Sequence, residues 1–309
     1  MPSKPSQSTP VRGAPSASAP EPHAAPARLT RRAYQSAATG AERDYFVYLP
    51  AGYDSEPASS WPLLVVLHGD GERGNAKQDL DYLLKNGPLY EAWIQKRDLP
   101  FVIAAPQLPL YGRDQTVSYL QSRTRAEIPE RLAAGVPPRP PELPTPTPML
   151  GAVSDSRLPY GPEGPPDGWS KLEADVVHIV EAVTREHRVD PKRRYLTGIS
   201  YGAFGAWYVA SRHPQLFAAI APVVGWGHPD LMMPLAQANL PIWAFAGGRD
   251  TTIEAKYFYP GLQELESHGH SRLRFTIEAD MGHDVWARVY AGRDLYEWLL
   301  EFSRDSAAQ

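Results

Sequence analysis

Short, strongly apolar segments recur along this 309-residue chain and alternate with helical segments, a pattern compatible with few folds. Several of the apolar segments are hydrophobic at every position, which is typical of strands buried on both faces of a sheet. The pattern predicts strands at residues 45–49, 63–67, 101–105, 195–197, 217–224, 242–246 and 273–277.

The residues between these strands predict helices. Apolar side chains recur at helical spacing through residues 169–187, and Asp190-Pro191 follows that segment. Further helices are expected at residues 202–212 and 291–302. Strands that alternate with helices in this way predict an α/β fold with a mostly parallel, doubly wound sheet and helices on both of its faces.

Two proline-rich segments interrupt the pattern, one before the predicted domain and one within it. Residues 1–28 hold seven prolines and almost no large apolar side chain, so we expect a disordered tail before a single domain at residues 29–309. Residues 135–166 hold eleven prolines and are expected to form an inserted loop. The loop follows a predicted strand and should emerge at the carboxyl-end face of the sheet. Two interpretations are open there, a roof over a binding site and a passive solvated loop.

Composition excludes several classes of protein. With no cysteine, the chain has no disulfides, no cysteine-bound metal and no thiol nucleophile. The net charge of −4 comes without a dense basic run, so neither nucleic acid nor an anionic membrane is an expected partner. No stretch reaches the ~20 apolar residues that span a bilayer. Residues 1–28 lack the apolar core of a secretory signal, which favours a cytoplasmic location.

The most informative motif is Gly198-Ile199-Ser200-Tyr201-Gly202, which follows a predicted strand and opens a predicted helix. A serine on such a sharp turn needs neighbours without bulk, because strand and helix converge there. The bare pattern also arises by chance, but its strand-to-helix context favours a serine nucleophile.

A serine nucleophile needs a base, and a histidine base needs an acceptor that orients its ring. Asp250 follows the predicted strand 242–246, and His283 lies in the loop after the strand 273–277. We therefore expect Ser200, Asp250 and His283 to act together as nucleophile, orienting acid and base. Asp250 is also explained as an N-cap of a helix near residues 251–258, while Asp280 and Asp284 compete for the role of orienting acid.

A glycine-rich turn, Gly69-Asp70-Gly71, follows the strand 63–67 and exposes backbone N–H groups. Together with the amide of Tyr201, the amides of Asp70 and Gly71 are candidates for an oxyanion hole. Trp226 follows another apolar strand and is a candidate for the substrate pocket, although a tryptophan at such a place is at least as often part of the core.

These motifs resemble the α/β-hydrolase superfamily, and within it the bacterial carboxylesterase or predicted-peptidase group related to polyhydroxybutyrate depolymerases and feruloyl esterases. The resemblance is carried by VVLHGDGERG, AAPQ, YLTGISYGAFGAW and GHDVWARVY followed by LYEWLLE, and extends over residues 45–302 apart from the insertion. It implies the roles given above for Ser200, His283, Asp250 and the turn at Gly69 to Gly71 with Tyr201.

The expected function is hydrolysis of a small-molecule or polymeric carboxylic ester by a serine carboxylesterase, through an acyl-enzyme and without a metal or organic cofactor. A peptidase with the same three residues is the alternative within the enzyme class. A catalytically silent binding module, whose proline-rich segment docks on partners, is the alternative outside it. Nothing in the sequence predicts an oligomeric state.

Overall fold

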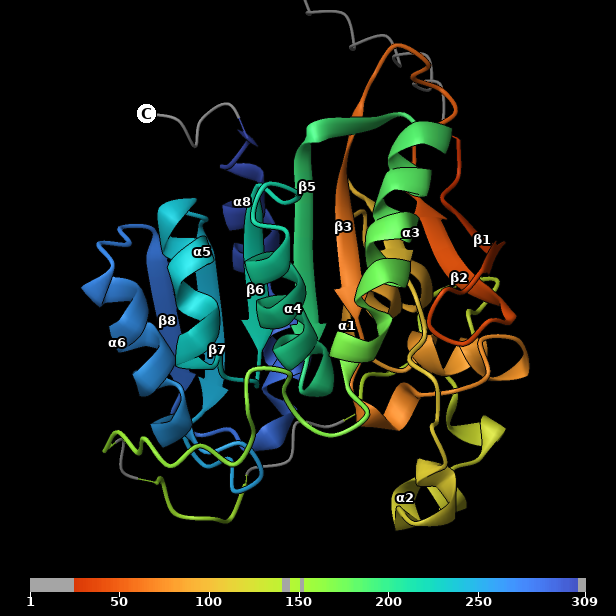
Figure 1. Ribbon diagram of the computed structural model, residues 1–309. Coiled ribbons are helices and arrows are strands. Elements are labelled where there is room, and N and C mark those ends of the chain that lie inside the picture. Colours follow the sequence, from red (N-terminus) through yellow and green to blue (C-terminus); the bar gives the residue numbers. More distant parts are fainter. Residues whose placement is uncertain (1–24, 141–144, 151–152, 305–309) are drawn as a thin grey trace, which may run out of the picture.

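The computed structural model describes residues 25–140, 145–150 and 153–304. They contain one eight-stranded sheet in the order β1-β2-β4-β3-β5-β6-β7-β8 (Figure 1). β1 and β2 are antiparallel to their neighbours, and the remaining pairs are parallel. The strands are β1 (Arg28–Gln35), β2 (Glu42–Leu49), β3 (Trp61–Leu67), β4 (Val102–Ala105), β5 (Val189–Ile199), β6 (Ala219–Val223), β7 (Ile242–Gly247) and β8 (Leu273–Glu278).

Helices cover both faces of the sheet, which confirms the expected α/β fold class. α3 (Glu173–Glu186), α4 (Tyr201–Arg212), α5 (Met232–Gln237) and α6 (Tyr259–Ser267) cover the face turned to the viewer in Figure 1. The opposite face is covered by η2 (Gln78–Leu84), α1 (Gly87–Leu89), η3 (Tyr90–Ile94), α7 (Trp286–Ala291) and α8 (Asp294–Leu300).

Shorter helical elements complete the described chain. They are η1 (Asp70–Glu72), η4 (Arg113–Gln115), α2 (Ser118–Ser122), η5 (Arg125–Glu127), η6 (Trp169–Leu172), η7 (Pro229–Leu231), η8 (Ala255–Tyr257) and η9 (His283–Val285). The helix predicted at residues 169–187 therefore begins with the 3-10 turn η6 before it continues as α3. Near residues 251–258 the structure has only the short η8, so no longer helix follows Asp250 there.

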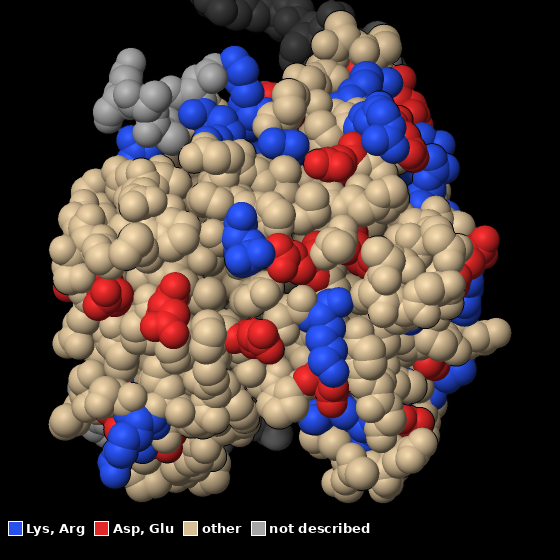
Figure 2. All heavy atoms as spheres, in the orientation of Figure 1, with Lys and Arg blue, Asp and Glu red and all other residues tan. Residues whose placement is uncertain are grey.

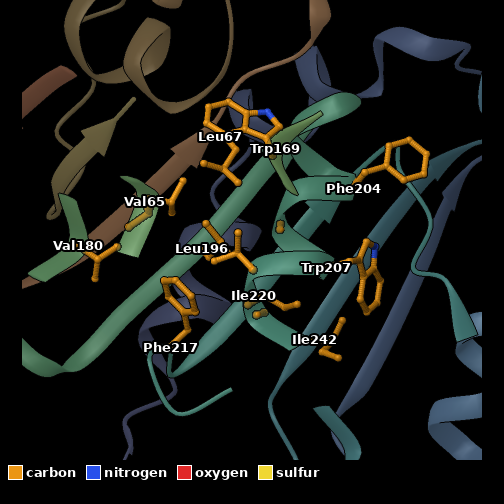
Figure 3. Close-up of a cluster of buried hydrophobic side chains, with 14 of the residues drawn as sticks. Val65, Leu67, Trp169, Val180, Leu196, Phe204, Trp207, Phe217, Ile220 and Ile242 are labelled. Carbon is orange, nitrogen blue, oxygen red and sulfur yellow. The ribbon is translucent and has the colours of Figure 1, made fainter. Parts of the chain in front are cut away.

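The strand β3 shows why both faces of the sheet are buried. Leu63, Val65 and Leu67 face the side of α3 and α4, whereas Leu64 and Val66 face the side of η2 and α1. Successive side chains of a strand point to opposite faces, so an uninterrupted apolar strand requires a cover on each side. Figure 3 shows the first of these layers, in which Leu196 and Ile220 of the sheet meet Trp207 of α4.

The strand β1 is the one strand of the described sheet that the apolar pattern did not predict. Its sequence RLTRRAYQ contains three arginines, and Tyr34 is its only buried residue. β1 forms because its backbone pairs with β2 along its full length, from Arg28 opposite Leu49 to Gln35 opposite Glu42. An edge strand with one solvated face needs little apolar surface. Apart from residues 25–28, the predicted tail lies outside the described residues.

The described part of the proline-rich insertion crosses the carboxyl-end face of the sheet, as expected from its position in the chain. The backbone N–H of Leu150 donates to Gly248 O (2.9 Å), just after β7. Arg249 donates to the carbonyls of Thr145 and Thr147, each at 3.2 Å. The insertion thus lies against the loops that follow β7 and β8.

Positive and negative side chains lie beside one another on the face drawn in Figure 2 and do not gather there into a large patch of one sign. Within the part of the chain that the structure describes, no helix combines the length and the apolar character needed to cross a membrane.

Candidate active site

Ser200 occupies the sharp turn between β5 and α4. Its backbone has φ +52° and ψ −112°, a conformation that is rare for a residue with a side chain and costs of order 1–3 kcal/mol. Three backbone hydrogen bonds hold the turn: Ser200 N–H donates to Val223 O of β6 (2.9 Å), and Ser200 O accepts from Ala203 (2.8 Å) and Phe204 (3.2 Å). The fold therefore maintains a strained position at the carboxyl end of the sheet.

The two glycines of the motif permit this turn by allowing close approach. A Cβ on Gly198 would lie 2.1 Å from Gly202 O, and a Cβ on Gly202 would lie 1.9 Å from Leu67 O at the end of β3. Real Cβ atoms do not approach an oxygen so closely. The glycines thus bring the start of α4 against the loop that follows β3.

His283 links Ser200 to Asp250. Its Nε2 lies 3.0 Å from Ser200 Oγ, and its Nδ1 lies 2.7 Å from Asp250 Oδ2. The imidazole is partly exposed, whereas the Asp250 side chain is fully buried. These distances allow the nitrogen on the carboxylate side to donate and the nitrogen on the serine side to accept a proton. The structure thus brings together three side chains that the sequence places after three different strands.

Asp250 contacts the histidine and also holds the turn that follows it, but it caps no helix. While Oδ2 faces His283, Oδ1 accepts the backbone N–H groups of Thr252 (2.8 Å) and Ile253 (2.9 Å). The expected helix N-cap is therefore not present, because residues 251–253 form a turn and η8 begins only at Ala255. Of its two competitors, Asp280 is paired with Arg288 at 2.7 and 2.8 Å and is largely exposed, and Asp284 lines a neighbouring cavity.

His68 holds the loop that follows β3. Its Nε2 accepts the backbone N–H of Leu108 (2.8 Å), so Nδ1 carries the proton and donates to Gly69 O (2.6 Å). Burial lowers the pKa of His68 to about 3, and the imidazole is therefore neutral near pH 7. In a trans peptide the following N–H points opposite to the carbonyl, which directs the Asp70 amide away from His68.

The carbonyls of the next residues in this loop are held as well. Arg123 donates to Gly71 O (3.2 Å) and to Arg73 O, and Gln107 donates to Glu72 O (2.8 Å). A backbone held at consecutive carbonyls has little freedom to rotate its amides, which suits a group of preorganised donors.

The side chain of Asp70 is buried behind the loop and does not block it. It accepts hydrogen bonds from Arg73, from Arg113 (2.7 Å to Oδ2) and from Tyr119. Burial alone would raise the pKa of Asp70, but the hydrogen bonds from Arg113 and Tyr119 and the charge of Arg73 outweigh it and lower that pKa. The guanidinium groups of Arg73 and Arg113 lie 4.8 and 5.3 Å from the ring centre of Tyr201. Two of the candidate donor residues, Asp70 and Tyr201, are thus tied to one cluster of side chains.

Trp226 belongs to the core of the structure. It is 1% exposed, and Tyr160 of the insertion stacks against it at 6.1 Å between ring centres. Phe204 of α4 meets it edge to face at 5.0 Å. Trp226 is therefore a core residue, and the prediction that it lines a substrate pocket is not supported, because aromatic rings of α4 and of the insertion cover it.

Other residues around the site had no sequence signal. Trp286 meets the ring of His283 edge to face at 5.3 Å, and its Nε1 donates to Asn86 Oδ1 (3.3 Å). Asn86 in turn donates to the buried carboxylate of Glu72 (2.6 Å), and burial raises the pKa of Glu72. The hydrogen bond between Trp286 and Asn86 joins residues 200 positions apart. For His68, the sequence does hold a signal, since this histidine stands directly before the glycine-rich turn that follows β3.

Comparison with known proteins relates the segment around Ser200 to esterases. The family model described as Esterase PHB depolymerase matches residues 164–230. Poly(3-hydroxyalkanoate) depolymerase C of Paucimonas lemoignei is 38% identical over 50 residues, which are 16% of this chain and 12% of the depolymerase.

Solved structures share the fold over most of the chain. A thermostable esterase matches with a TM-score of 0.59 and 24% identity, covering 89% of this chain and 63% of its own. An S-formylglutathione hydrolase of Staphylococcus aureus matches with a TM-score of 0.53 and 12% identity, covering 90% and 98%. The chain spans less than two thirds of the depolymerase and of the thermostable esterase. The chain thus has the fold of α/β-hydrolase esterases, and its segment around Ser200 is similar to the polyhydroxybutyrate depolymerase esterases.

Proposed function

We propose that this protein is a serine esterase that hydrolyses a carboxylic ester through an acyl-enzyme on Ser200. The observation that carries the proposal is the hydrogen-bonded chain from Ser200 Oγ through His283 to Asp250, with contacts of 3.0 and 2.7 Å. The match to an esterase family model over the Ser200 segment supports ester hydrolysis. The fold by itself would not support ester hydrolysis, because the same fold hosts many activities.

In the first half of the reaction, Ser200 Oγ forms a bond to the ester carbonyl carbon while its proton passes to His283 Nε2. The carbonyl π electrons move to the oxygen, which becomes an oxyanion. When that electron pair returns, the bond to the alcohol oxygen breaks, and His283 gives its proton to the leaving alcohol. The product that stays on the enzyme is an acyl ester of Ser200.

In the second half, His283 takes a proton from water as the water oxygen attacks the acyl carbon. The resulting oxyanion collapses, the bond to Ser200 Oγ breaks, and the proton returns to the serine. Asp250 stays ionised and stabilises the imidazolium that forms in each half. The buried position of Asp250 and its two backbone hydrogen bonds hold it against the ring.

The oxyanion would be stabilised by backbone amides. Tyr201 lies at the N-terminus of α4, where the first N–H groups have no partner within the helix. The loop with Asp70 and Gly71 lies beside it, because Gly202 packs against Leu67 O. Loss of one such donor typically costs about 10²- to 10³-fold in rate.

Labelling with a fluorophosphonate, combined with hydrolysis of p-nitrophenyl acetate, tests the proposal. We expect one adduct on Ser200 of the full chain, and a loss of about 10⁴-fold or more in kcat for Ser200→Ala. Ser267→Ala is the matched control, since this exposed serine ends α6 just before the amino end of β8, whereas the three residues follow the carboxyl ends of their strands. An unlabelled, inactive wild-type protein, or a folded Ser200→Ala variant with near-full activity, contradicts the proposal.

A further inference from the structure

A cavity of about 270 Å³ opens beside the candidate active site. One wall is the segment from Lys85 to Glu91, and the opposite wall is α7 with the preceding Asp284. Arg139 and Pro140 of the proline-rich insertion form part of a third wall. None of the chemistry described above uses this space.

The cavity adjoins the reacting residues from two directions. Trp286 lines it and meets the ring of His283 edge to face, with 5.3 Å between the ring centres. Gly87 also lines it, and a Cβ on Gly87 would lie 3.2 Å from the Cδ1 of Ile199, the residue before Ser200. Asp284, the residue after His283, lines it as well, so the cavity lies directly beside the imidazole and beside the residue that precedes Ser200.

Both cationic groups on the walls, Lys85 and Arg139, are paired with carboxylates. Both oxygens of Glu91 accept hydrogen bonds from Arg139 at 2.6 Å, and Lys85 is paired with Glu127 at 2.6 Å. The cationic side chains that line the cavity, Lys85 and Arg139, are therefore already engaged in ion pairs and offer little attraction to an anionic ligand. A ligand carboxylate would instead lie near the carboxyl groups of Glu91 and Asp284, which disfavours an anion.

The uncharged part of these walls is largely aromatic. Tyr90, Trp286 and Tyr290 line the cavity. The hydroxyl of Tyr290 is bonded to Thr197 Oγ1 (2.7 Å), that of Tyr90 accepts from Gln95 (2.8 Å), and the indole N–H of Trp286 donates to Asn86. Their polar atoms are engaged, so they offer ring surfaces. An apolar cavity of about 150 Å³ already holds benzene, and this larger space of about 270 Å³ admits a ring system larger than benzene.

We propose that this cavity is the subsite for an uncharged aromatic group on the alcohol side of the ester, with Arg139 of the insertion closing one wall. This inference rests on the proposed function. His283 must give its proton to the leaving alcohol oxygen, so the alcohol lies on the imidazole side of the bond that breaks. Trp286 lines the cavity and also contacts the imidazole ring. The rest of the alcohol, which extends away from the imidazole side of the breaking bond, therefore enters this cavity.

Esters that share an acyl group isolate this subsite. 2-Naphthyl acetate and ethyl acetate form the same acetyl-enzyme, so a difference that a substitution makes between their kcat/KM values arises on the alcohol side. We measure the ratio of the two kcat/KM values in wild type, Ala287→Phe, Arg139→Ala and Arg131→Ala. Ala287 is an exposed residue of α7 that lines the cavity, and its replacement by Phe fills the space.

Ala287→Phe should lower the ratio by about 10-fold or more, the effect typical of a lost apolar pocket. Arg139→Ala should lower it less, because it opens a wall without filling the space. Arg131→Ala is the matched control: Arg131 stacks on Trp93 at 4.0 Å, outside the cavity, and its removal should leave the ratio unchanged.

An unchanged ratio in folded Ala287→Phe or in Arg139→Ala overturns the subsite. Should Ala287→Phe fail to fold, the ratio for Arg139→Ala decides alone. A second pair, ethyl 2-naphthoate and ethyl acetate, carries the ring on the acyl side, and a larger ratio change in that pair overturns the alcohol-side placement. A wild-type protein that hydrolyses none of these esters refutes the proposed function, which is a different outcome from a lost ratio.

Discussion

Asp250 contacts His283 through Oδ2 and the backbone of Thr252 and Ile253 through Oδ1, so each oxygen has a separate role. Asp250→Asn keeps an acceptor for the turn at Thr252 and Ile253 but places an amide or a neutral oxygen against His283. The fold should therefore survive while the histidine adopts the wrong tautomer.

We expect Asp250→Asn to lower kcat on one activated ester by up to about 10⁴-fold. Asp280→Asn and Asp284→Asn should have mild effects, since Asp280 is turned to Arg288 and Asp284 to the neighbouring cavity. Circular dichroism confirms that all three variants fold. If kcat falls severely in Asp280→Asn or Asp284→Asn while Asp250→Asn stays active, the orienting acid is misassigned. Asp250 then only stabilises the turn at Thr252 and Ile253.

His68 predicts a sensitivity of the fold to acid. The folded protein keeps this imidazole neutral, with a pKa of about 3, whereas an unfolded histidine titrates near 6.5. Between these values the unfolded chain binds more protons, so the contribution of His68 to stability is complete above pH 6.5 and is lost as the pH falls toward 3.

The measurement is the free energy of unfolding against pH for wild type and His68→Gln. The wild-type slope should exceed the variant slope by up to about 1.4 kcal/mol per pH unit in this range, which corresponds to one proton. Parallel curves would mean that the pKa of His68 is the same in the folded and the unfolded protein, which would contradict its neutral, buried state beside Leu108 and Gly69.

At the level of elements, the contact between the start of α4 and the end of β3 aligns the turn at Ser200 with the loop at Asp70. Gly202→Ala would place a methyl group 1.9 Å from Leu67 O, and that oxygen belongs to the backbone of a central strand. Neither partner can yield easily, because β3 is paired on both sides.

We expect Gly202→Ala to lower the free energy of unfolding by about 1–3 kcal/mol or more, the usual cost of overpacking. Gly71→Ala in the adjoining loop is the stability control: an added Cβ there meets nothing within 4 Å, and the change should stay within about 0.5 kcal/mol. Denaturant unfolding measures both. Equal stability of the two variants would contradict the close approach of α4 and β3.

At the scale of the whole molecule, one sheet with two apolar layers supports every residue of the candidate site. Ser200, Asp250 and His283 follow β5, β7 and β8, and the loop with Asp70 follows β3. These strands are parallel, so their carboxyl ends meet at one edge. The insertion lies along the same edge through Thr145, Thr147 and Leu150. The architecture therefore gathers residues that are distant in the chain.

From the sequence alone, the fold class and the meeting of Ser200, Asp250 and His283 were predictable. Both depend on patterns that are local in the chain: apolar strands, a glycine-flanked serine, and polar residues placed just after strands. The chemical roles of these residues stay predictions. The edge strand β1 was not predictable, because backbone pairing with β2 stabilises it without an apolar pattern.

The tertiary structure alone decided which partners each polar side chain finds. The side chain of Asp70 is buried because it accepts hydrogen bonds from Arg113 and Tyr119. His68 holds its loop in place because its ring accepts the backbone N–H of Leu108. The cavity beside Trp286 exists because α7 and the insertion pack around the segment that follows Lys85. Such contacts join residues tens to hundreds of positions apart, and their geometry depends on how whole elements pack, which no local pattern in the sequence encodes.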